Sequence, residues 1–83
     1  MTTANTRGTL PGEGAAAVTP NDSTDLTTIA RALYVGGAGD VKIDAADGST
    51  VTFVGVQAGS IIPVRAARVY ATGTDATNIV AIY

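Results

Sequence analysis

The sequence predicts an all-β fold, a small antiparallel β-sandwich or jelly-roll-like domain with an extended N-terminal arm. From residue 26 onward, short apolar-polar runs are separated by clusters of Gly, Asp, Ser and Thr, a pattern typical of strands and turns. Before residue 26 the chain is rich in Thr, Gly, Ala and Pro and has no apolar period, as in extended segments. Since 83 residues allow one domain, we divide the chain into a flexible arm, 1–25, and a β domain, 26–83.

The arm contains three kinds of sequence. Residues 1–14 have the composition of a disordered tail. Ala15 to Val18 is apolar enough to dock onto a partner, and Asn21-Asp22-Ser23 predicts a turn.

The first strand of the domain is predicted over residues 29–35, where large residues alternate with Ala30, Ala32 and Tyr34. A helix over 26–33, capped by Ser23, is the alternative. The β-branched content and the turn cluster predicted at residues 36–40, GGAGD, favour the strand.

The middle of the domain is predicted to be a hairpin. Residues 41–44 alternate as a second strand, Asp47-Gly48 is a strong hairpin signal, and residues 49–56 form the returning strand. Within that strand, Val51 and Phe53 face one way, whereas Thr50, Thr52 and Val54 face the other.

The last third contains two further predicted strands. A turn at 57–60 leads into a long run over 61–70, in which Pro63 favours an edge or a bulge. A turn at 72–75 precedes the final strand, 78–83, which is apolar to its last residue, Tyr83. Because chain ends usually fray, we expect part of this strand's partner to come from a neighbouring copy.

The predicted core is small. The apolar fraction is 46%, but much of it is Ala and Val, and a single core of this size rarely contributes more than about 3–5 kcal/mol. The chain has no Cys and no His, which excludes disulfides and thiolate zinc sites and removes the commonest transition-metal ligand. We therefore expect homo-oligomerisation to support the fold, and no cofactor.

Charge and hydropathy exclude other partners. Only 14% of the residues are charged, and five Lys and Arg residues make no stripe that could neutralise phosphates, so direct nucleic-acid binding is not expected. No run approaches about 18 apolar residues, so no membrane span is predicted. The start, MTTANTRGTLPGEG, lacks the basic and apolar regions of a secretory signal.

The sequence motifs that would indicate nucleotide binding, calcium binding or catalysis are incomplete. In VGGAGDVK, Lys42 stands where a dinucleotide fingerprint needs its third glycine. Asp40, Asp44 and Asp47 lack the calcium-loop spacing, with Ala46 at a ligand position; a loose site shared between subunits is the alternative. A nucleophilic Ser or Thr would have no His base. We predict no enzyme, and no catalytic, cofactor or metal site.

Arginines and tyrosines remain as candidate contact residues. The arginines are either solvated or paired with Asp40 or Asp75, or else they bind carboxylates or carbonyls at a subunit seam. The tyrosines suit an interface or a core edge better than a sugar platform, which would lack supporting Asn and Gln. With Ile82 these form the predicted interface set: Arg31, Tyr34, Arg65, Arg68, Tyr70, Ile82 and Tyr83.

The chain resembles the spike base proteins of tailed-phage heads, including those of gene transfer agents. The resemblance covers about four-fifths of the chain, roughly residues 18–83, and RALYVG…GD followed by PVR…RVYATGT is its most specific part. The other matching segments, in order, are Thr19-Pro20-Asn21-Asp22-Ser23, Asp25-Leu26, Val51-Thr52-Phe53, Gly55-Val56, Gly59 and Ile79-Val80.

The resemblance implies a structural virion protein on the outer capsid surface at the vertices, made in the host cytoplasm, that carries a spike or fibre. Its implied partners are copies of itself, with a pentamer favoured over a trimer, the major capsid protein, and a spike or fibre protein. Gly36, Gly39 and Gly73 would hold turns. A carbohydrate-binding module that contacts the host, or a tail or collar component, are the alternatives.

Overall fold

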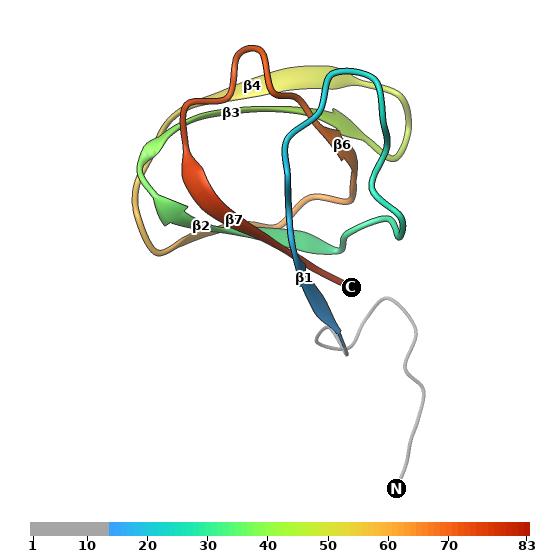
Figure 1. Ribbon diagram of the computed structural model, residues 1–83, viewed down its shortest axis with the longest axis horizontal. Helices are drawn as coiled ribbons and strands as arrows, with labels where there is room; N and C mark the ends of the chain where they lie inside the picture. The colour runs from blue at the N-terminus through green and yellow to red at the C-terminus, as the bar shows by residue number, and fades with distance from the viewer. Residues whose placement is uncertain (1–13) are drawn as a thin grey trace, which may run out of the picture.

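The computed structural model describes residues 14–83, and this part of the chain is all-β, as predicted (Figure 1). Its seven strands are β1 Ala15–Ala17, β2 Ala32–Gly37, β3 Gly39–Ala45, β4 Thr50–Val56, β5 Ser60–Ile62, β6 Ala66–Val69 and β7 Thr77–Ile82. One sheet has four strands in the order β1-β7-β2-β5, and the other has three in the order β4-β3-β6. All pairs are antiparallel, so the fold is a small β-sandwich.

The core lies between the two sheets. The four-stranded sheet contributes Leu33 and Val35 of β2, and the three-stranded sheet contributes Val41 and Ile43 of β3; all four are fully buried. The alternation seen in the sequence puts them inward, because successive side chains of a strand point to opposite faces. The other buried residues are Ala30, Ile62, Ala66, Val69, Ala76, Ile79 and Ala81.

The hairpin from β3 to β4 agrees with the sequence. Gly48 has a φ of 93° in the turn, and the register pairs Ile43 with Val51 and Val41 with Phe53. Those two β4 residues therefore share one face, as predicted. The turns at 57–60 and 72–75 are confirmed by the bonds from Ser60 N–H to the Gln57 carbonyl and from Thr74 N–H to the Ala71 carbonyl.

The cluster at residues 36–40 is not a turn, contrary to the prediction. Gly36 and Gly37 end β2, Gly39 and Asp40 begin β3, and a single residue separates the strands. Glycine is needed here for close approach: a Cβ on Gly39 would lie 2.5 Å from the Ala76 backbone nitrogen. Residues 26–33 contain no helix, so the predicted strand was the right choice over the alternative helix. The strand begins at Ala32, three residues later than predicted.

The run over 61–70 is two strands, not one. It breaks at Pro63–Arg65, so that β5 lies at an edge of one sheet and β6 at an edge of the other. Pro63, predicted to mark an edge or a bulge within one strand, instead lies at the break directly after β5, where its inability to donate to a ladder has no cost. Arg65 lies outside both strands, so it does not share a strand with Arg68 as predicted.

The final strand has partners on both sides within its own chain. β7 lies between β1 and β2, and Ile82 is opposite both Ala15 and Ala32. The expectation that a neighbouring copy completes this strand is therefore wrong. The apolar end is explained by an interior position in the sheet (Figure 1).

The segment 14–25 lies against the body. β1 pairs with β7, and Val18 N–H donates to the Ile79 carbonyl at 2.9 Å. Further along, Asn21 N–H donates to the Val69 carbonyl and Leu26 N–H to the Ala67 carbonyl, so this segment covers the outer edge of β6. The predicted disordered tail, apart from Gly14, lies outside the described residues.

Candidate functional site

The outer surface of the four-stranded sheet is apolar. The register places Ala17 opposite Val80, Val80 opposite Tyr34, and Tyr34 opposite Ile61. Directly opposed residues of antiparallel strands point to the same face, and their sequence neighbours Leu33, Ile62, Ile79 and Ala81 are buried in the core. This row therefore crosses all four strands on the outer side, with Tyr34 38% and Ile61 59% exposed.

A second outer row lies beside the first. Ala15 is opposite Ile82, and Ile82 is opposite Ala32. No residue in either row carries a charge, although an antiparallel sheet normally turns polar residues to solvent. We call the two rows together the apolar face: Ala15, Ala17, Ala32, Tyr34, Ile61, Val80 and Ile82.

The outer surface of the three-stranded sheet is charged. Asp44 lies opposite both Thr50 and Arg68, and its carboxylate accepts hydrogen bonds from the Thr50 hydroxyl and from the Tyr70 hydroxyl, the latter at 2.8 Å. These bonds, the Thr50 bond first, hold the pKa of Asp44 below its usual value. Lys42 Nζ lies 4.8 Å from the centre of the Tyr70 ring, a cation–π distance.

Arg68 is held within its own chain. Its Nε donates to Asp25 at 2.8 Å and its Nη1 to the Asp22 carbonyl at 3.1 Å. The hydrogen bond to Asp25 raises the pKa of Arg68 above its already high value. Arg68 therefore forms an ion pair, one of the two predicted alternatives for the arginines. Its partner is Asp25, not Asp40 or Asp75.

Asp22 fastens the 21–25 segment to the turn after β6. Its carboxylate accepts hydrogen bonds from the backbone N–H groups of Ala71 and Thr72 at 2.9 and 2.8 Å, and from the Thr72 hydroxyl at 2.6 Å. The Thr72 hydroxyl bond is the largest cause of a pKa of Asp22 below its ordinary value. The role of these residues is structural.

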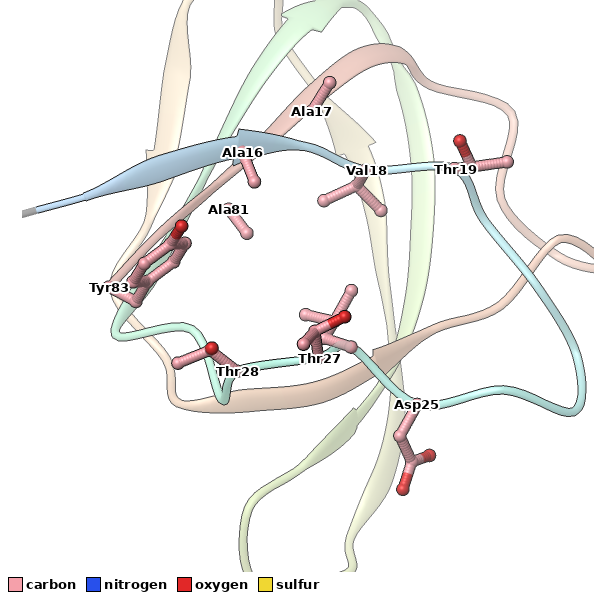
Figure 2. A pocket seen from close by; sticks show the side chains of 10 residues that line it. Ala16, Ala17, Val18, Thr19, Asp25, Thr27, Thr28, Ala81 and Tyr83 are labelled. Carbon is pink, nitrogen blue, oxygen red and sulfur yellow. The ribbon is translucent and has the colours of Figure 1, made fainter.

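A hollow of about 450 Å³ lies between β1 and the segment before β2. Figure 2 shows Ala16, Val18 and Ala81 around it, with Tyr83 at one end. Its single acidic residue, Asp25, points away from the centre in this view and is bound to Arg68. The described lining therefore offers small apolar surfaces and threonine hydroxyls but no group placed for acid-base or nucleophilic chemistry.

The structure separates the predicted interface residues. Tyr34 and Ile82 belong to the apolar face, Arg68 and Tyr70 to the charged surface, and Tyr83 to the hollow. The remaining two lie apart from these groups: Arg31 is partly buried just before β2, and Arg65 is exposed between β5 and β6. The three tyrosines lie on three different surfaces and form no sugar-stacking platform.

The sequence reasoning missed several exposed apolar residues. Val54, at 78% exposed, is the most exposed large apolar residue described, and Val51 is 46% exposed. Both lie on β4, an edge strand. The sequence did contain a signal for this exposed apolar strand, because no residue from 48 to 64 is charged.

Among residues 14–83, no group of three or more His, Cys, Asp or Glu side chains is placed to hold a metal ion. No helix in this part of the chain is long and apolar enough to cross a membrane. The fold and its surfaces define a small β-sandwich module with one apolar and one charged outer surface.

Comparison with solved structures gives a match over nearly the whole chain. A chain from the capsid of a native GTA (gene transfer agent) particle, computed with C5 symmetry, has a solved structure that is 40% identical to this chain, with a TM-score of 0.85. The match covers 95% of this chain and 92% of that chain. Scans of protein-family models and of curated proteins return no match.

At this identity and coverage the chain belongs to the family of head proteins found in gene transfer agents and related phage particles. It is a structural, capsid-associated protein. The resemblance expected from the sequence is confirmed at this level.

Proposed function

We propose that the protein is the base of a head spike, or a capsid decoration, on the outer surface of a phage-like head. Its partners are the major capsid protein below, a spike or fibre protein above, and other copies of itself. The observation that carries the proposal is the match, over nearly the whole chain, to a component of a GTA capsid computed with five-fold symmetry. A position at the five-fold vertices favours a pentamer; a three-fold decoration would be a trimer.

The assignment as a structural protein without catalysis agrees with the described surfaces. The side chains of Asp22, Asp44 and Arg68 are each held by local hydrogen bonds within the chain. A carbohydrate-binding role loses its main support because Tyr34, Tyr70 and Tyr83 do not converge. The alternative location of the protein, in the tail or collar of the particle, has to be excluded by experiment.

Electron microscopy of particles tests location. Particles made with a tagged copy of this chain should carry the label on the outside of the head at the vertices. Particles made without the chain should lack that density and should also lack the spike or fibre. Label at the tail, or spikes retained without the chain, would contradict the proposal.

The N-terminal arm is proposed to help attach the protein to the head or to a neighbouring copy. Deletion of residues 1–13 should then lower the occupancy of the protein on particles while the β body stays folded. Equal occupancy of the deleted and full-length chains, measured by quantitative gel analysis of purified particles, would contradict this role.

A further inference from the structure

We propose that the open edge of β4 accepts an added strand, formed by residues 2–9 of an adjacent copy of the chain. This inference deepens the proposed function, on which it rests, because it assumes that copies meet around a symmetry axis. It gives the N-terminal arm a binding site on its neighbour, which the comparison does not provide.

The backbone of β4 has hydrogen-bonding groups that point away from its own sheet. Among the described residues β4 pairs with β3 alone, and Thr52 lies opposite Lys42. Both backbone groups of Lys42 are used on its other side, where its N–H donates to the Thr74 hydroxyl and its carbonyl accepts from the Tyr70 N–H. Thr52 and Lys42 are therefore a pair without mutual hydrogen bonds, and the N–H and carbonyl of Thr52 face the open edge.

Thr50 presents its backbone in the same direction. Opposed pairs of an antiparallel ladder alternate between bonded and non-bonded, so the pair of Thr50 with Asp44 is of the same kind as Thr52 with Lys42. The next pair agrees with this alternation, because Ala45 N–H donates to the Ser49 carbonyl. The edge thus offers the N–H and carbonyl groups of both threonines, at the two-residue spacing that an extended chain matches.

No described residue protects this edge. Proteins usually guard an exposed edge strand with charge, proline or a covering segment, and β4 contains neither charge nor proline. The opposite edge of the same sheet, β6, is covered by the N-terminal region of the chain, since the Asn21 and Leu26 N–H groups donate to the Val69 and Ala67 carbonyls. An extended segment would supply the same kind of backbone partner to β4, as in recognition by strand addition.

The sequence of residues 2–9, TTANTRGT, suits the added strand. It has no proline, and half of its residues are threonine, which favours strands and pairs well with threonine on a neighbouring strand, as with Thr50 and Thr52. Its one charged residue is Arg7, and in the β3–β4 hairpin three aspartates outnumber one lysine. The arm and the hairpin therefore have complementary charge.

The point where the arm joins the body favours an adjacent copy over the arm's own β4. Gly14 is bonded to Tyr83 beside β1, and Figure 1 shows this end of β1 across the molecule from β4. If residues 2–9 pair, residues 10–13 remain as the linker, which spans about 14 Å when extended. An arm-to-edge contact also joins unlike surfaces, as a closed ring of copies requires.

Proline substitutions test the backbone contacts from both sides. Thr52→Pro removes an N–H that faces the open edge, where proline costs the β3–β4 ladder no hydrogen bond. The double variant Asn5→Pro with Thr6→Pro removes two successive N–H groups of the arm, one of which must face β4 in any register. Each protein should self-associate about tenfold or more weakly than the parent, measured by sedimentation.

Matched controls change the same side chains and keep every backbone N–H. Thr52→Val, and Asn5→Ser with Thr6→Ser, should associate within about threefold of the parent. Circular dichroism checks that each variant is folded, and the arm variants leave every residue of the sandwich unchanged. At concentrations where the copies are separate, the arm variants should unfold like the parent, because the pairing is between copies.

Cysteine cross-linking tests which segments meet, and the chain has no cysteine of its own. Thr52→Cys protein is mixed with proteins that carry one cysteine at successive arm positions, residues 3–8. Mixed dimers should form at alternate arm positions, the period of a strand. Ala71→Cys, exposed just after β6 at the opposite edge of the sheet, should give no product above background.

Other outcomes overturn the inference. Weaker association of Thr52→Pro but not of the arm variant would mean that another segment covers β4. Cross-links without the two-residue period, or links formed only within one chain when both cysteines are placed on it, would contradict strand addition between copies. A parent chain that stays monomeric at about 100 μM would also overturn it. These results come from the purified chain, whereas microscopy of particles decides the head location, so failure of one leaves the other standing.

Discussion

At the scale of single residues, the structure depends on side chains that tie distant segments together. Asp22 is the clearest case, because its carboxylate accepts three hydrogen bonds from Ala71 and Thr72, about fifty positions further along the chain. Because these donors stabilise the charged carboxylate, they hold the pKa of Asp22 below its usual value. Stability should therefore depend on pH through this residue.

Replacing Asp22 by Asn should lower the melting temperature at pH 7. A carboxyl whose pKa is lower in the folded than in the unfolded state stabilises the fold fully above the unfolded value, 3.8. That contribution is lost as pH falls through the folded pKa. The difference in melting temperature between the variant and the parent should thus shrink below about pH 4. Asp75→Asn is the matched control, an equal charge change at an exposed position that removes none of the three hydrogen bonds of Asp22. An identical profile for both variants would contradict the role of Asp22.

Substitution of glycine at two positions of positive φ compares a crowded site, Gly39, with an open one, Gly48. Gly39→Ala should destabilise the protein by about 2–4 kcal/mol, because the added Cβ would meet the Asp75–Ala76 backbone at 2.5 to 2.9 Å. Gly48→Ala should cost about 1–2 kcal/mol, since its φ is positive but no atom lies within 4 Å. Urea unfolding measures both, and equal costs would show that the contact at Gly39 relaxes.

At the scale of elements, β1 and β7 explain how the chain closes its larger sheet. β7 is an interior strand, with β2 on one side and β1 on the other. Gly14 and Tyr83 exchange two backbone hydrogen bonds, at 2.7 and 2.9 Å. The N-terminal segment is thus part of the sandwich from residue 14 onward, and β1 supplies two residues of the apolar face.

Two truncations should have different effects on folding. Deletion of residues 1–13 should leave the unfolding free energy unchanged within about 0.5 kcal/mol, because β1 is retained. Deletion of residues 1–17 removes β1 with the Gly14–Tyr83 pair, and should cost about 2–4 kcal/mol at roughly 1 kcal/mol per lost backbone hydrogen bond. Denaturant titration compares them; equal stability would show that β1 contributes nothing to the isolated chain.

At the scale of the whole molecule, the two outer surfaces of the sandwich differ in chemistry. The three-stranded sheet turns Lys42, Asp44 and Arg68 outward, whereas the four-stranded sheet turns outward only uncharged residues. A small core of Leu, Ile, Val and Ala gives a marginal monomer. The homo-oligomer proposed above would bury further area and so support this fold.

The melting temperature should therefore rise by several degrees as the protein concentration is raised from about 1 to about 100 μM, since association stabilises the folded state by mass action. Differential scanning calorimetry at both protein concentrations measures the shift. A melting temperature independent of concentration would indicate a self-sufficient monomer.

The sequence alone determined the fold class, the β3–β4 hairpin and most turns. These follow from local signals: alternation with a period of two, Asp47-Gly48, and clusters of Gly, Ser, Thr and Asp at the turns. It also determined that no His or Cys chemistry is available, and its resemblance to phage-type head proteins pointed to the family.

The tertiary structure decided which strands became neighbours. Periodicity shows that residue 34 faces away from residue 33, but not that Ala17, Val80, Tyr34 and Ile61 align across one sheet. That alignment depends on long-range pairing between residues up to 67 positions apart, as between Ala15 and Ile82. For the same reason the predicted interface set was scattered: single residues were chosen by type, whereas a contact surface is defined by register. Only the packed sheets show that one outer surface is charged and the other apolar.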